Sequence, residues 1–505
     1  MTIATSPVVG KRAAATEERL TGAQWLLFIG LLVGVFLGAM DSTVLATLLP
    51  RMLGDLGAMA FAPWIVAVYL LMQICAGPIF GKLSDQIGRK RVFLFSLAVF
   101  AGGSELIGWS RGALTLLVGR AVQGIGAGIA VPVALSSIYL LFPRSLQPRL
   151  NGWFSATYGL ACIVGPIVGQ LAGAAFGWQA VFHANAPIVA IAAIIIVTQM
   201  DDVIQPSAER FDWRGALSFA SATIAICMLL LPLSDPDIHL GRFGYCAIAA
   251  LAALSAVAFV YIEAKAEAPI VPPEFLAENT FAAAGNVATG AIMFAALMFL
   301  PTFASGVLRV PVMLAVLPLT LGIVIGTLSC GRFVGKLRLT RAGPLGASIA
   351  ALGAGGIATL HSGQAVWPVA CCAFAIGIGV GFLIVTLVIA MQFQAPPERM
   401  GTASAMSQFL RSFGGLVGVN LLAALQSSLF DHGMQRAGPV LNSAFEQAGG
   451  RSALGTMLFA GSGSDTDELF TLVRATYAHA TTSVFLAVAA LCVFTACVAA
   501  RLRSW

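Results

Sequence analysis

The chain has 505 residues, of which 58% are hydrophobic and 10% are charged, and its mean hydropathy is +0.90. This composition, with apolar runs of about 20 residues recurring to the end of the chain, excludes a soluble globular protein and predicts an all-α integral membrane protein. The net charge of +6 includes no basic cluster large enough to follow a phosphate backbone, so nucleic acid is excluded as a partner.

Fourteen apolar stretches are long enough to be membrane-spanning helices. In chain order they lie near residues 25–49, 61–81, 92–109, 112–140, 151–174, 179–199, 213–233, 243–262, 280–301, 312–330, 344–360, 366–390, 402–429 and 475–500. The first 24 residues are polar, and they are too long and too hydrophilic to lead a cleaved signal peptide. We therefore expect the first helix to remain in the protein.

One carboxylate, Asp41, interrupts the first apolar stretch. An ionisable side chain near the middle of a span costs about 2.5–3.5 kcal/mol on insertion scales, so it normally faces a cavity or a partner rather than lipid. We interpret Asp41 as the centre of a functional site. The alternative is a structural acid that is hydrogen-bonded between helices.

The basic residues are distributed unevenly between the segments that connect the spans. If the N-terminus is cytoplasmic, the cytoplasmic segments hold 19 of the 28 Lys and Arg residues and the outer segments hold seven. Positive residues accumulate on the cytoplasmic side of membrane proteins. The sequence therefore predicts a multi-pass protein of the cell's inner (plasma) membrane with both termini in the cytoplasm.

Three segments recur at a separation of about 250 residues. Pro50 and Pro301 each close a span, GIGAGIA from Gly124 aligns with GIGVGFL from Gly377, and the loop from Gly81 is echoed weakly by residues 331–343. The repeat predicts two pseudo-symmetric six-helix bundles around a substrate pathway, with spans seven and eight inserted between them. Chance similarity of glycine-rich apolar segments is the alternative.

The repeat also gives the expected domain boundaries. These are a cytoplasmic tail at 1–24, an N-terminal bundle at 25–200, a linker with two inserted helices at 201–263, a stiff cytoplasmic connector at 264–279, and a C-terminal bundle at 280–505 with an external loop at 430–474.

The loop after the second span reads GKLSDQIGRKRVF and resembles the signature loop of the major facilitator superfamily. It matches at Gly81, Leu83, Asp85, Gly88, Arg89 and Lys90 and departs at Ser84 and Gln86. The glycines permit a tight turn, and the position of Asp85 suits a gate in which it pairs with an arginine and caps a neighbouring helix. A loop that only follows the positive-inside rule is the alternative.

The fourth span, LLVGRAVQGIGAG, resembles a second motif of the same superfamily through Leu116, Arg120, Gln123, Gly124, Gly126 and Ala127. A buried arginine needs an anion. By helical rise, Asp41 and Arg120 both lie about 12 Å from the outer ends of their spans. The two side chains are therefore expected to meet if these helices are neighbours, as they are in the fold that the motifs resemble.

The fifth span contains Gly165, Pro166 and Gly169 in an element that resembles the GPxxGG motif of the antiporter branch. Gln170 replaces the final glycine and Ala161 the usual upstream one. Small residues allow helices to approach closely, and proline relaxes a helix locally. The motif favours export over uptake, and a purely structural packing seam is the alternative.

Three further segments resemble one branch, the fourteen-span drug:proton antiporters. They are DSTV from Asp41, GWQAVFHANAP from Gly177 and FDWRGALS from Phe211. The resemblance covers nearly the whole chain and implies that Asp41 couples proton transfer to alternating access, with export of amphipathic and often cationic small molecules. The ninth span has no duplicated acid near Ala291.

Two more charged residues are candidates. Glu105, near the outer end of the third span, is either a second proton or cation site or an acid of the membrane interface. Arg411, in the thirteenth span, is either a gate residue or a contact for lipid headgroups. Arg411 is also a possible cavity residue, together with aromatic and amide residues that could line a cavity or simply pack: Trp64, Tyr69, Gln73, Phe154 and Tyr158.

Enzyme chemistry has no support in this sequence, because the nine cysteines and five histidines are scattered without ligand or nucleophile spacing. No cofactor or metal is expected. The expected partners are lipid, protons and a small-molecule substrate, with the loop at 430–474 offering a contact for a periplasmic adaptor, and the protein is expected to act as a monomer.

The resulting prediction is a proton-coupled exporter. The alternatives are a dedicated exporter of a lipid, siderophore or other endogenous product, a proton-coupled uptake transporter, and a membrane sensor or scaffold without transport. The last is disfavoured because no soluble signalling domain follows any span.

Overall fold

The structure, a computed structural model, is all-helical in the residues that it describes. These are residues 20–56, 62–143, 145–201, 211–234, 241–266, 273–333, 339–360, 366–393, 395, 400–437, 443–445, 447 and 468–502. The N-terminal tail to residue 19, part of the 201–263 linker and most of the 430–474 loop lie outside the described residues.

The helices follow the predicted spans closely. Their bounds are α1 (Gly22–Leu56), α2 (Ala62–Ile87), α3 (Arg89–Gly108), α4 (Ala113–Leu141), α5 (Gln147–Phe176), α6 (Trp178–His183), α7 (Asn185–Gln199), α8 (Trp213–Ser234), α9 (Arg242–Glu263), α10 (Pro273–Glu278), α11 (Thr280–Gly306), α12 (Val312–Phe333), α13 (Leu339–Ala358), α14 (Val366–Phe393), α15 (Met400–Arg436) and α18 (Glu468–Ala500).

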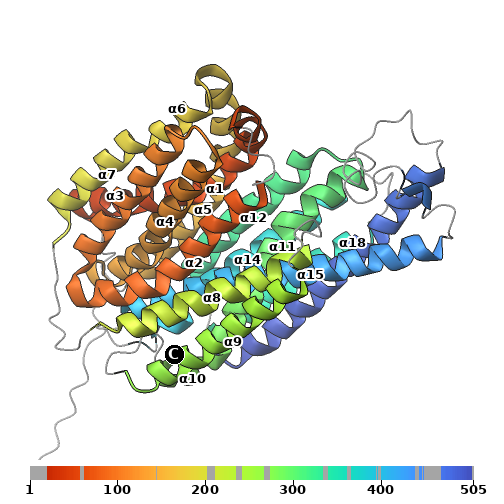
Figure 1. Cartoon of the computed structure of the whole chain (residues 1–505). Helices are drawn as coiled ribbons and strands as arrows, with labels where there is room; N and C mark the ends of the chain where they lie inside the picture. Colours follow the sequence, from red (N-terminus) through yellow and green to blue (C-terminus); the bar gives the residue numbers. More distant parts are fainter. Residues whose placement is uncertain are drawn as a thin grey trace, which may run out of the picture.

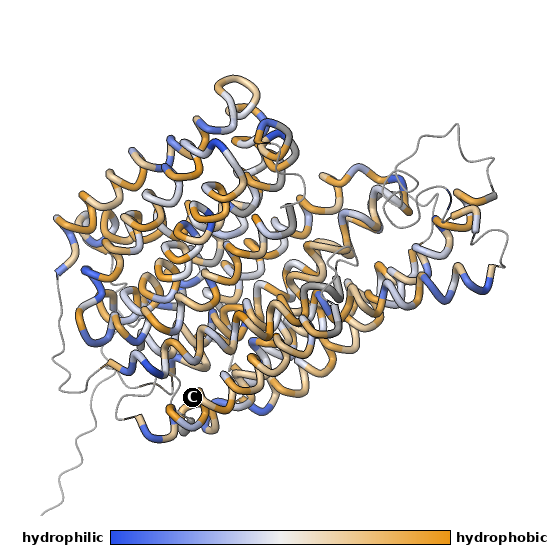
Figure 2. Tube along the Cα trace, viewed as in Figure 1, coloured by the Kyte–Doolittle hydropathy of each residue, from blue (hydrophilic) through white to orange (hydrophobic). Residues whose placement is uncertain are grey.

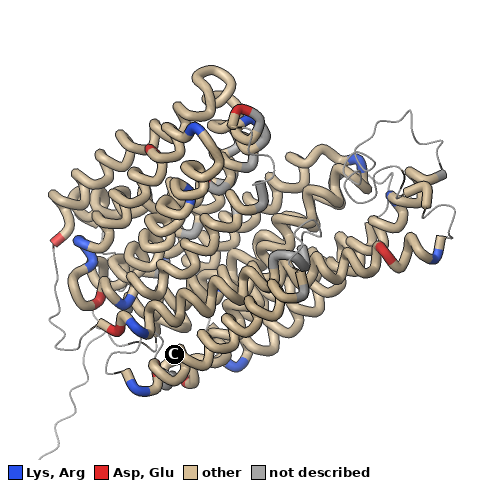
Figure 3. Tube along the Cα trace, in the orientation of Figure 1, with Lys and Arg blue, Asp and Glu red and all other residues tan. Residues whose placement is uncertain are grey.

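Thirteen of the described helices or helix pairs are long and apolar enough to cross a membrane. The predicted stretch at 344–360 is not among them, because glycines and Arg341 lower the hydropathy of α13. Apolar residues run along the helices in Figure 2, and charged residues gather mainly at the helix ends in Figure 3. This pattern is the one that a membrane-embedded bundle requires.

The helices form an N-terminal group, α1 to α7, and a C-terminal group, α11 to α15 with α18 (Figure 1). The buried apolar side chains divide in the same way: one cluster contains only residues between 27 and 200, and two clusters contain only residues between 275 and 502. Each group therefore has a core of its own.

Glycines make similar close approaches between two helices in each group. A Cβ on Gly124 of α4 would strike the backbone oxygen of Tyr69 in α2, and a Cβ on Gly377 of α14 would strike that of Leu319 in α12. Gly128 and Gly381 make the equivalent approaches one turn further along. Glycines at matching positions thus bring the backbones of α4 and α2, and of α14 and α12, close together.

Several boundaries differ from the sequence prediction. The span at 179–199 is divided at Ala184 into α6 and α7, and α15 continues to Arg436, past the predicted end at residue 429. The expected connector at 264–279 contains the short helix α10, which three prolines near its start did not suggest. The helices α8 and α9 pack on each other, and α8 also contacts α2 and α15 (Figure 1).

Candidate functional site

An ion pair lies among the buried side chains of α1 and α4. Asp41 and Arg120 are 2% and 1% exposed, and Arg120 Nη1 donates a hydrogen bond to Asp41 Oδ2. A Cβ on Gly38, one turn before Asp41, would lie 3.1 Å from the Cβ of Ala127, so α1 and α4 are close here. The contact expected from helix depth is therefore present, and each buried charge has an opposite charge beside it.

The side-chain amide of Gln123 bridges the two charges. Its Nε2 donates to Asp41 Oδ1 at 2.7 Å, and its Oε1 accepts from Arg120 Nη1 at 2.7 Å. The opposite amide orientation would set oxygen against the carboxylate and NH2 against the guanidinium. The charges on both sides therefore fix this orientation.

The network continues into α3 and α7. Gln123 Nε2 also donates to Ser104 Oγ at 2.8 Å, and Asn185 Nδ2 donates to the same oxygen at 3.1 Å. Ser104 and Asn185 are both buried. Sequence analysis did not identify either residue. Asn185 lies within the GWQAVFHANAP segment and had a signal there, whereas Ser104 had none.

Tyr69 of α2 completes the surroundings of Arg120. Its ring centre lies 4.1 Å from Arg120 Cζ, which is a cation–π contact, and its hydroxyl donates to the backbone oxygen of Gly38 at 2.8 Å. Arg120 Nε also donates to the backbone oxygen of Ile65 at 3.4 Å. The guanidinium therefore has partners on several sides.

The predicted antiporter motif packs α5 against α1 beside Asp41. A Cβ on Gly165 would strike Thr43 Oγ1 and lie 3.0 Å from the backbone oxygen of Met40, and a Cβ on Gly169 would strike Thr47 Oγ1. Thr43 Oγ1 also donates to the backbone oxygen of Ala161 at 3.2 Å. Pro166 lies within α5, but its side chain is outside the described ones.

The signature loop joins the two helix groups at the end of the molecule where α2 leads into α3. Asp85 accepts hydrogen bonds at 3.0 Å from the backbone N–H groups of Gly401 and Thr402, in the first turn of α15, and at 3.1 Å from the Thr402 hydroxyl. Arg89 Nη2 lies 2.6 Å from Asp85 Oδ1. A carboxylate at a helix N-terminus is favoured by the helix dipole, so Asp85 holds α2 to α15.

The glycines of this loop have distinct geometric tasks. A Cβ on Gly81 would strike Ala405 of α15, so the two helices touch there. Gly88 separates α2 from α3 with φ of 101°, a conformation that residues with a side chain rarely adopt. Lys90 points to the adjacent α7 and donates to the backbone oxygen of Val197 at 2.8 Å.

Glu105 follows Ser104 near the C-terminal end of α3, but its side chain contacts His183 and Trp109 and not Asp41. Its Oε2 is 2.7 Å from His183 Nδ1 and accepts a hydrogen bond from Trp109 Nε1 at 3.2 Å. The side chains of Glu105 and His183 are 37% and 32% exposed. This geometry suits an interface acid, and a role in proton transfer stays a prediction.

Arg411 of α15 is a second buried arginine, 6% exposed. It donates to Gln408 Oε1 on its own helix, while its Nη1 has no hydrogen-bond partner in the part of the chain that the structure describes. Tyr158 of α5 lies near enough to interact with it electrostatically, and Tyr158 interacts in the same way with Tyr69. Arg411 therefore has a neighbour, Tyr158, in the N-terminal group.

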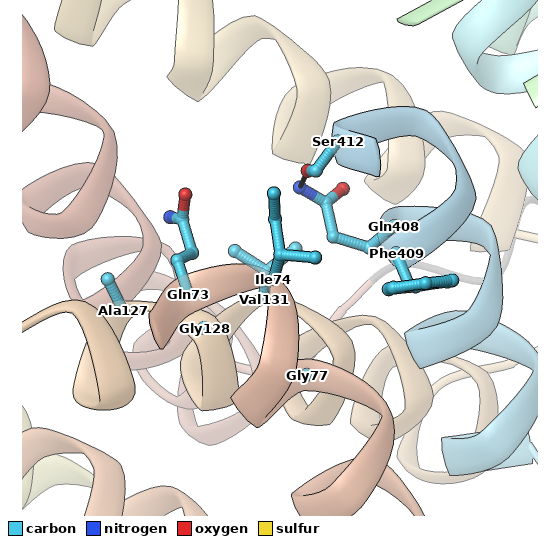
Figure 4. A pocket seen from close by; sticks show the side chains of 9 residues that line it. All are labelled: Gln73, Ile74, Gly77, Ala127, Gly128, Val131, Gln408, Phe409 and Ser412. Atoms are coloured by element: carbon cyan, nitrogen blue, oxygen red, sulfur yellow. Dashed lines mark hydrogen bonds between the residues drawn. The ribbon is translucent and has the colours of Figure 1, made fainter. Parts of the chain in front are cut away.

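Two adjoining cavities lie where the helix groups meet. The larger, of about 250 Å³, is lined by residues of α2, α11 and α15: Leu70, Gln73, Ile74, Phe294, Leu297, Met298, Ser412, Gly415, Leu416 and Val419. The smaller shares Gln73, Ile74 and Ser412 and adds Gln408, which lies beside Ser412 and across from Gln73 in Figure 4. The walls are mostly apolar, with a few amide and hydroxyl groups.

The predicted cavity residues are only partly brought together. Gln73 lines both cavities, whereas Trp64, Tyr69, Phe154, Tyr158 and Arg411 line neither. Phe154 and Tyr158 are neighbours on α5, with ring centres 6.4 Å apart. Hydrophobic periodicity did not reveal the contribution of α11, because a cavity wall and a packed core have the same composition.

Comparison with known proteins agrees with this architecture. The family model of the Major Facilitator Superfamily matches residues 31–419. Multidrug resistance protein 3 of Bacillus subtilis is 30% identical over 448 residues, which is 88% of this chain and 85% of that protein. The tetracenomycin C resistance and export protein of Streptomyces glaucescens is 28% identical over 424 residues, covering 81% and 77% of the two chains.

The fold is also that of a solved transporter. The crystal structure of a bacterial homolog of the human lysosomal transporter Spinster matches 95% of this chain and 97% of its own, with a TM-score of 0.57 and 16% identity. The chain therefore belongs to the major facilitator superfamily, and it is a multi-pass membrane transporter rather than an enzyme.

Proposed function

We propose that this protein exports amphipathic small molecules in exchange for protons, by alternating access. The observation that carries the proposal is Asp41, a carboxylate buried among membrane-spanning helices and bound to Arg120 and Gln123. The neighbouring guanidinium favours the ionised carboxylate, whereas burial favours the protonated one. A movement that separates α1 from α4 would therefore let Asp41 take up a proton, and its reversal would release it.

The proposal includes the arrangement of the chain in the membrane. Fourteen spans, with α13 among them, would form two six-helix bundles at 25–200 and 280–505, with α8 and α9 inserted and both termini in the cytoplasm. The separate cores and matching glycine contacts support two bundles. The excess of basic residues on one side supports the orientation.

Asp85 would then act as a gate on the cytoplasmic side. Its hydrogen bonds to Gly401 and Thr402 join α2 to α15, so they must break before this end can open. Three hydrogen bonds and one ion pair concentrated on one carboxylate form a connection that can be broken as a unit. The cavity between α2, α11 and α15 offers an amphipathic molecule an apolar wall with Gln73 and Ser412 as polar contacts.

The direction of transport rests on the relatives and on the glycine seam beside Asp41. Two relatives are a multidrug resistance protein and an antibiotic resistance and export protein. Export of a lipid or siderophore would use the same scaffold, and the metabolites retained by cells without the gene would distinguish it.

The test is transport driven by a pH gradient in proteoliposomes that contain the purified full chain. Two probes that share the naphthylmethyl group cover both charges: 1-naphthylacetate and trimethyl(1-naphthylmethyl)ammonium. Wild type should move at least one probe against its gradient when the pH gradient is imposed. Asp41→Asn should fall to the level of empty liposomes while retaining its elution volume on size exclusion. Undiminished gradient-driven transport by this variant would contradict the proposal.

A further inference from the structure

The middle of the described helix bundle carries more positive than negative charge. The charged residues buried there are Asp41, Arg120 and Arg411, whereas Lys82, Asp85, Arg89 and Glu263 lie at helix ends. Asp41 and Arg120 neutralise each other. The positive charge of Arg411 is left without a carboxylate within ion-pair distance among the described residues.

Burying a guanidinium in this way is costly unless an anion accompanies it. An uncompensated buried charge destabilises a protein by several kcal/mol. Arg411 has one hydrogen bond to Gln408, an electrostatic contact with Tyr158 and an Nη1 group with no partner. Arginine presents its donors in a planar fork that suits a carboxylate or another oxyanion. In Arg411 the Nη1 side of this fork makes no hydrogen bond to a described residue.

Two of the roles expected for Arg411 from sequence, a lipid-headgroup contact and a gate residue, do not fit this position. A lipid-headgroup contact requires an exposed guanidinium, but Arg411 is 6% exposed. A gate role would place it beside Asp85, which binds Gly401 and Thr402. Ten residues of helix separate Gly401 from Arg411, which is about 15 Å along α15.

Arg411 itself lines neither cavity, but a polar path connects it to both. Arg411 binds Gln408, and Gln408 Nε2 lies 3.5 Å from Ser412 Oγ. Gln408 and Ser412 both line the smaller cavity, and Ser412 also lines the larger one (Figure 4). The apolar wall of the larger cavity begins at Ser412 and continues through Gly415, one turn further along α15. Polar and apolar surfaces are therefore adjacent.

We propose that Arg411 is the anion-binding subsite of the substrate cavity, so that the cargo is an amphipathic molecule with an acidic group. Its carboxylate or equivalent oxyanion binds the free side of the guanidinium, assisted by Gln408 and Ser412, and its apolar part fills the 250 Å³ cavity. This inference rests on the proposed export function, because the bound anion is a transported substrate only if the protein is an exporter. It also favours anionic over cationic substrates.

The test is equilibrium binding of tritiated 1-naphthylacetate to the purified full chain, by scintillation proximity, with trimethyl(1-naphthylmethyl)ammonium as the matched cation. Wild type should prefer the carboxylate probe. Arg411→Gln should weaken its binding by about 10- to 100-fold, as expected for loss of a charge-assisted hydrogen bond. Arg411→Lys keeps the positive charge but loses the planar fork of donors, so its affinity for the carboxylate probe should lie between those of wild type and Arg411→Gln.

The matched control is Arg436→Gln, which removes the same charge from the exposed last turn of the same helix and should bind like wild type. Preference of wild type for the ammonium probe, absence of saturable carboxylate binding, or equal affinity in Arg411→Gln would overturn the subsite. The wild-type preference stands as a test even if a variant does not fold.

Failure of this subsite and failure of the export proposal are distinguishable. The binding assay needs no pH gradient. A protein that exports the ammonium probe through Asp41 and does not bind the carboxylate probe refutes the role of Arg411 alone. One that binds the carboxylate probe through Arg411 and transports both probes unchanged after Asp41→Asn refutes the proton coupling alone.

Discussion

The two buried arginines of this transporter have contrasting surroundings. Arg120 has a carboxylate, an amide, a backbone oxygen and an aromatic ring around it, all supplied by the N-terminal helices. Arg411 has an amide from its own helix and an electrostatic contact with Tyr158, and one nitrogen is without a hydrogen bond. The same side chain is compensated from within the protein at one position and not at the other.

This difference separates two tasks that transport requires. A charge that the protein compensates itself can control the protonation of its partner, because the protein decides how near the two groups are. A charge that the protein leaves uncompensated favours whatever anion enters the cavity. The N-terminal group of helices would thus bind and release the proton, and the C-terminal group would bind the acidic group of the transported molecule.

The largest expected loss of stability comes from Arg120→Met, which tests whether Arg120 is compensated from within the protein. It removes the cation and leaves Asp41 buried with Gln123 alone, so the free energy of unfolding should fall by about 3–5 kcal/mol. Denaturant titration in detergent, followed by circular dichroism, would measure the loss. The double variant Asp41→Asn with Arg120→Met should recover most of it. No recovery would mean that packing, and not the unpaired carboxylate, accounts for the loss.

A finer change is Asn185→Ala, which touches neither charge. Asn185 donates to Ser104 Oγ, which then accepts from Gln123 as well, so that the Gln123 NH2 stays turned toward Asp41. Without Asn185, Ser104 loses one of its two hydrogen-bond donors, so the hydroxyl holds Gln123 Nε2 less firmly against the ionised Asp41 carboxylate. The pH profile of transport should move to higher pH by about half to one unit, the equivalent of one hydrogen bond.

Restoring a donor separates this effect from a purely structural one. Asn185→Gln keeps a side-chain amide donor that can still reach Ser104 and should return the pH profile part of the way toward wild type. A variant that lowers the rate equally at every pH would show that Asn185 only supports the packing of α7.

The smallest effect on stability is expected from Arg411→Met. Because no carboxylate is left behind, the free energy of unfolding should change by less than about 1 kcal/mol or should rise. The same denaturant titration, run beside Arg120→Met, provides the measurement. A loss as large as that of Arg120→Met would mean that Arg411 has a structural anionic partner, and the comparison would no longer hold.

Much of the fold could be predicted from the sequence because membrane helices are recognised by their length and hydropathy. The prediction weakened at α13, where glycines and Arg341 lower the hydropathy, and at Ala184, where an apolar run conceals the break between α6 and α7. The contact between Asp41 and Arg120 followed from their equal depth and from the neighbouring helices of the resembled fold. Periodicity alone does not say which helices are neighbours.

Other parts of the site could not be predicted in the same way. Ser104 is an ordinary small residue until α3 is placed beside α4, and Asn185 acts through it. The helix that Asp85 caps lies more than 300 residues away in sequence, so a short motif could not reveal it. That Arg411 Nη1 finds no hydrogen-bond partner among the described residues depends on all the helices around it, which no short motif encodes.

The most direct test of the central claim is an infrared titration of the purified transporter, comparing wild type with Asp41→Asn. The carboxylic acid C=O stretch of a buried group should appear in wild type as the pH falls through the range in which transport is driven, and it should be absent from the variant. Identical spectra for the two proteins across that range would show that Asp41 does not exchange a proton, and would contradict the account.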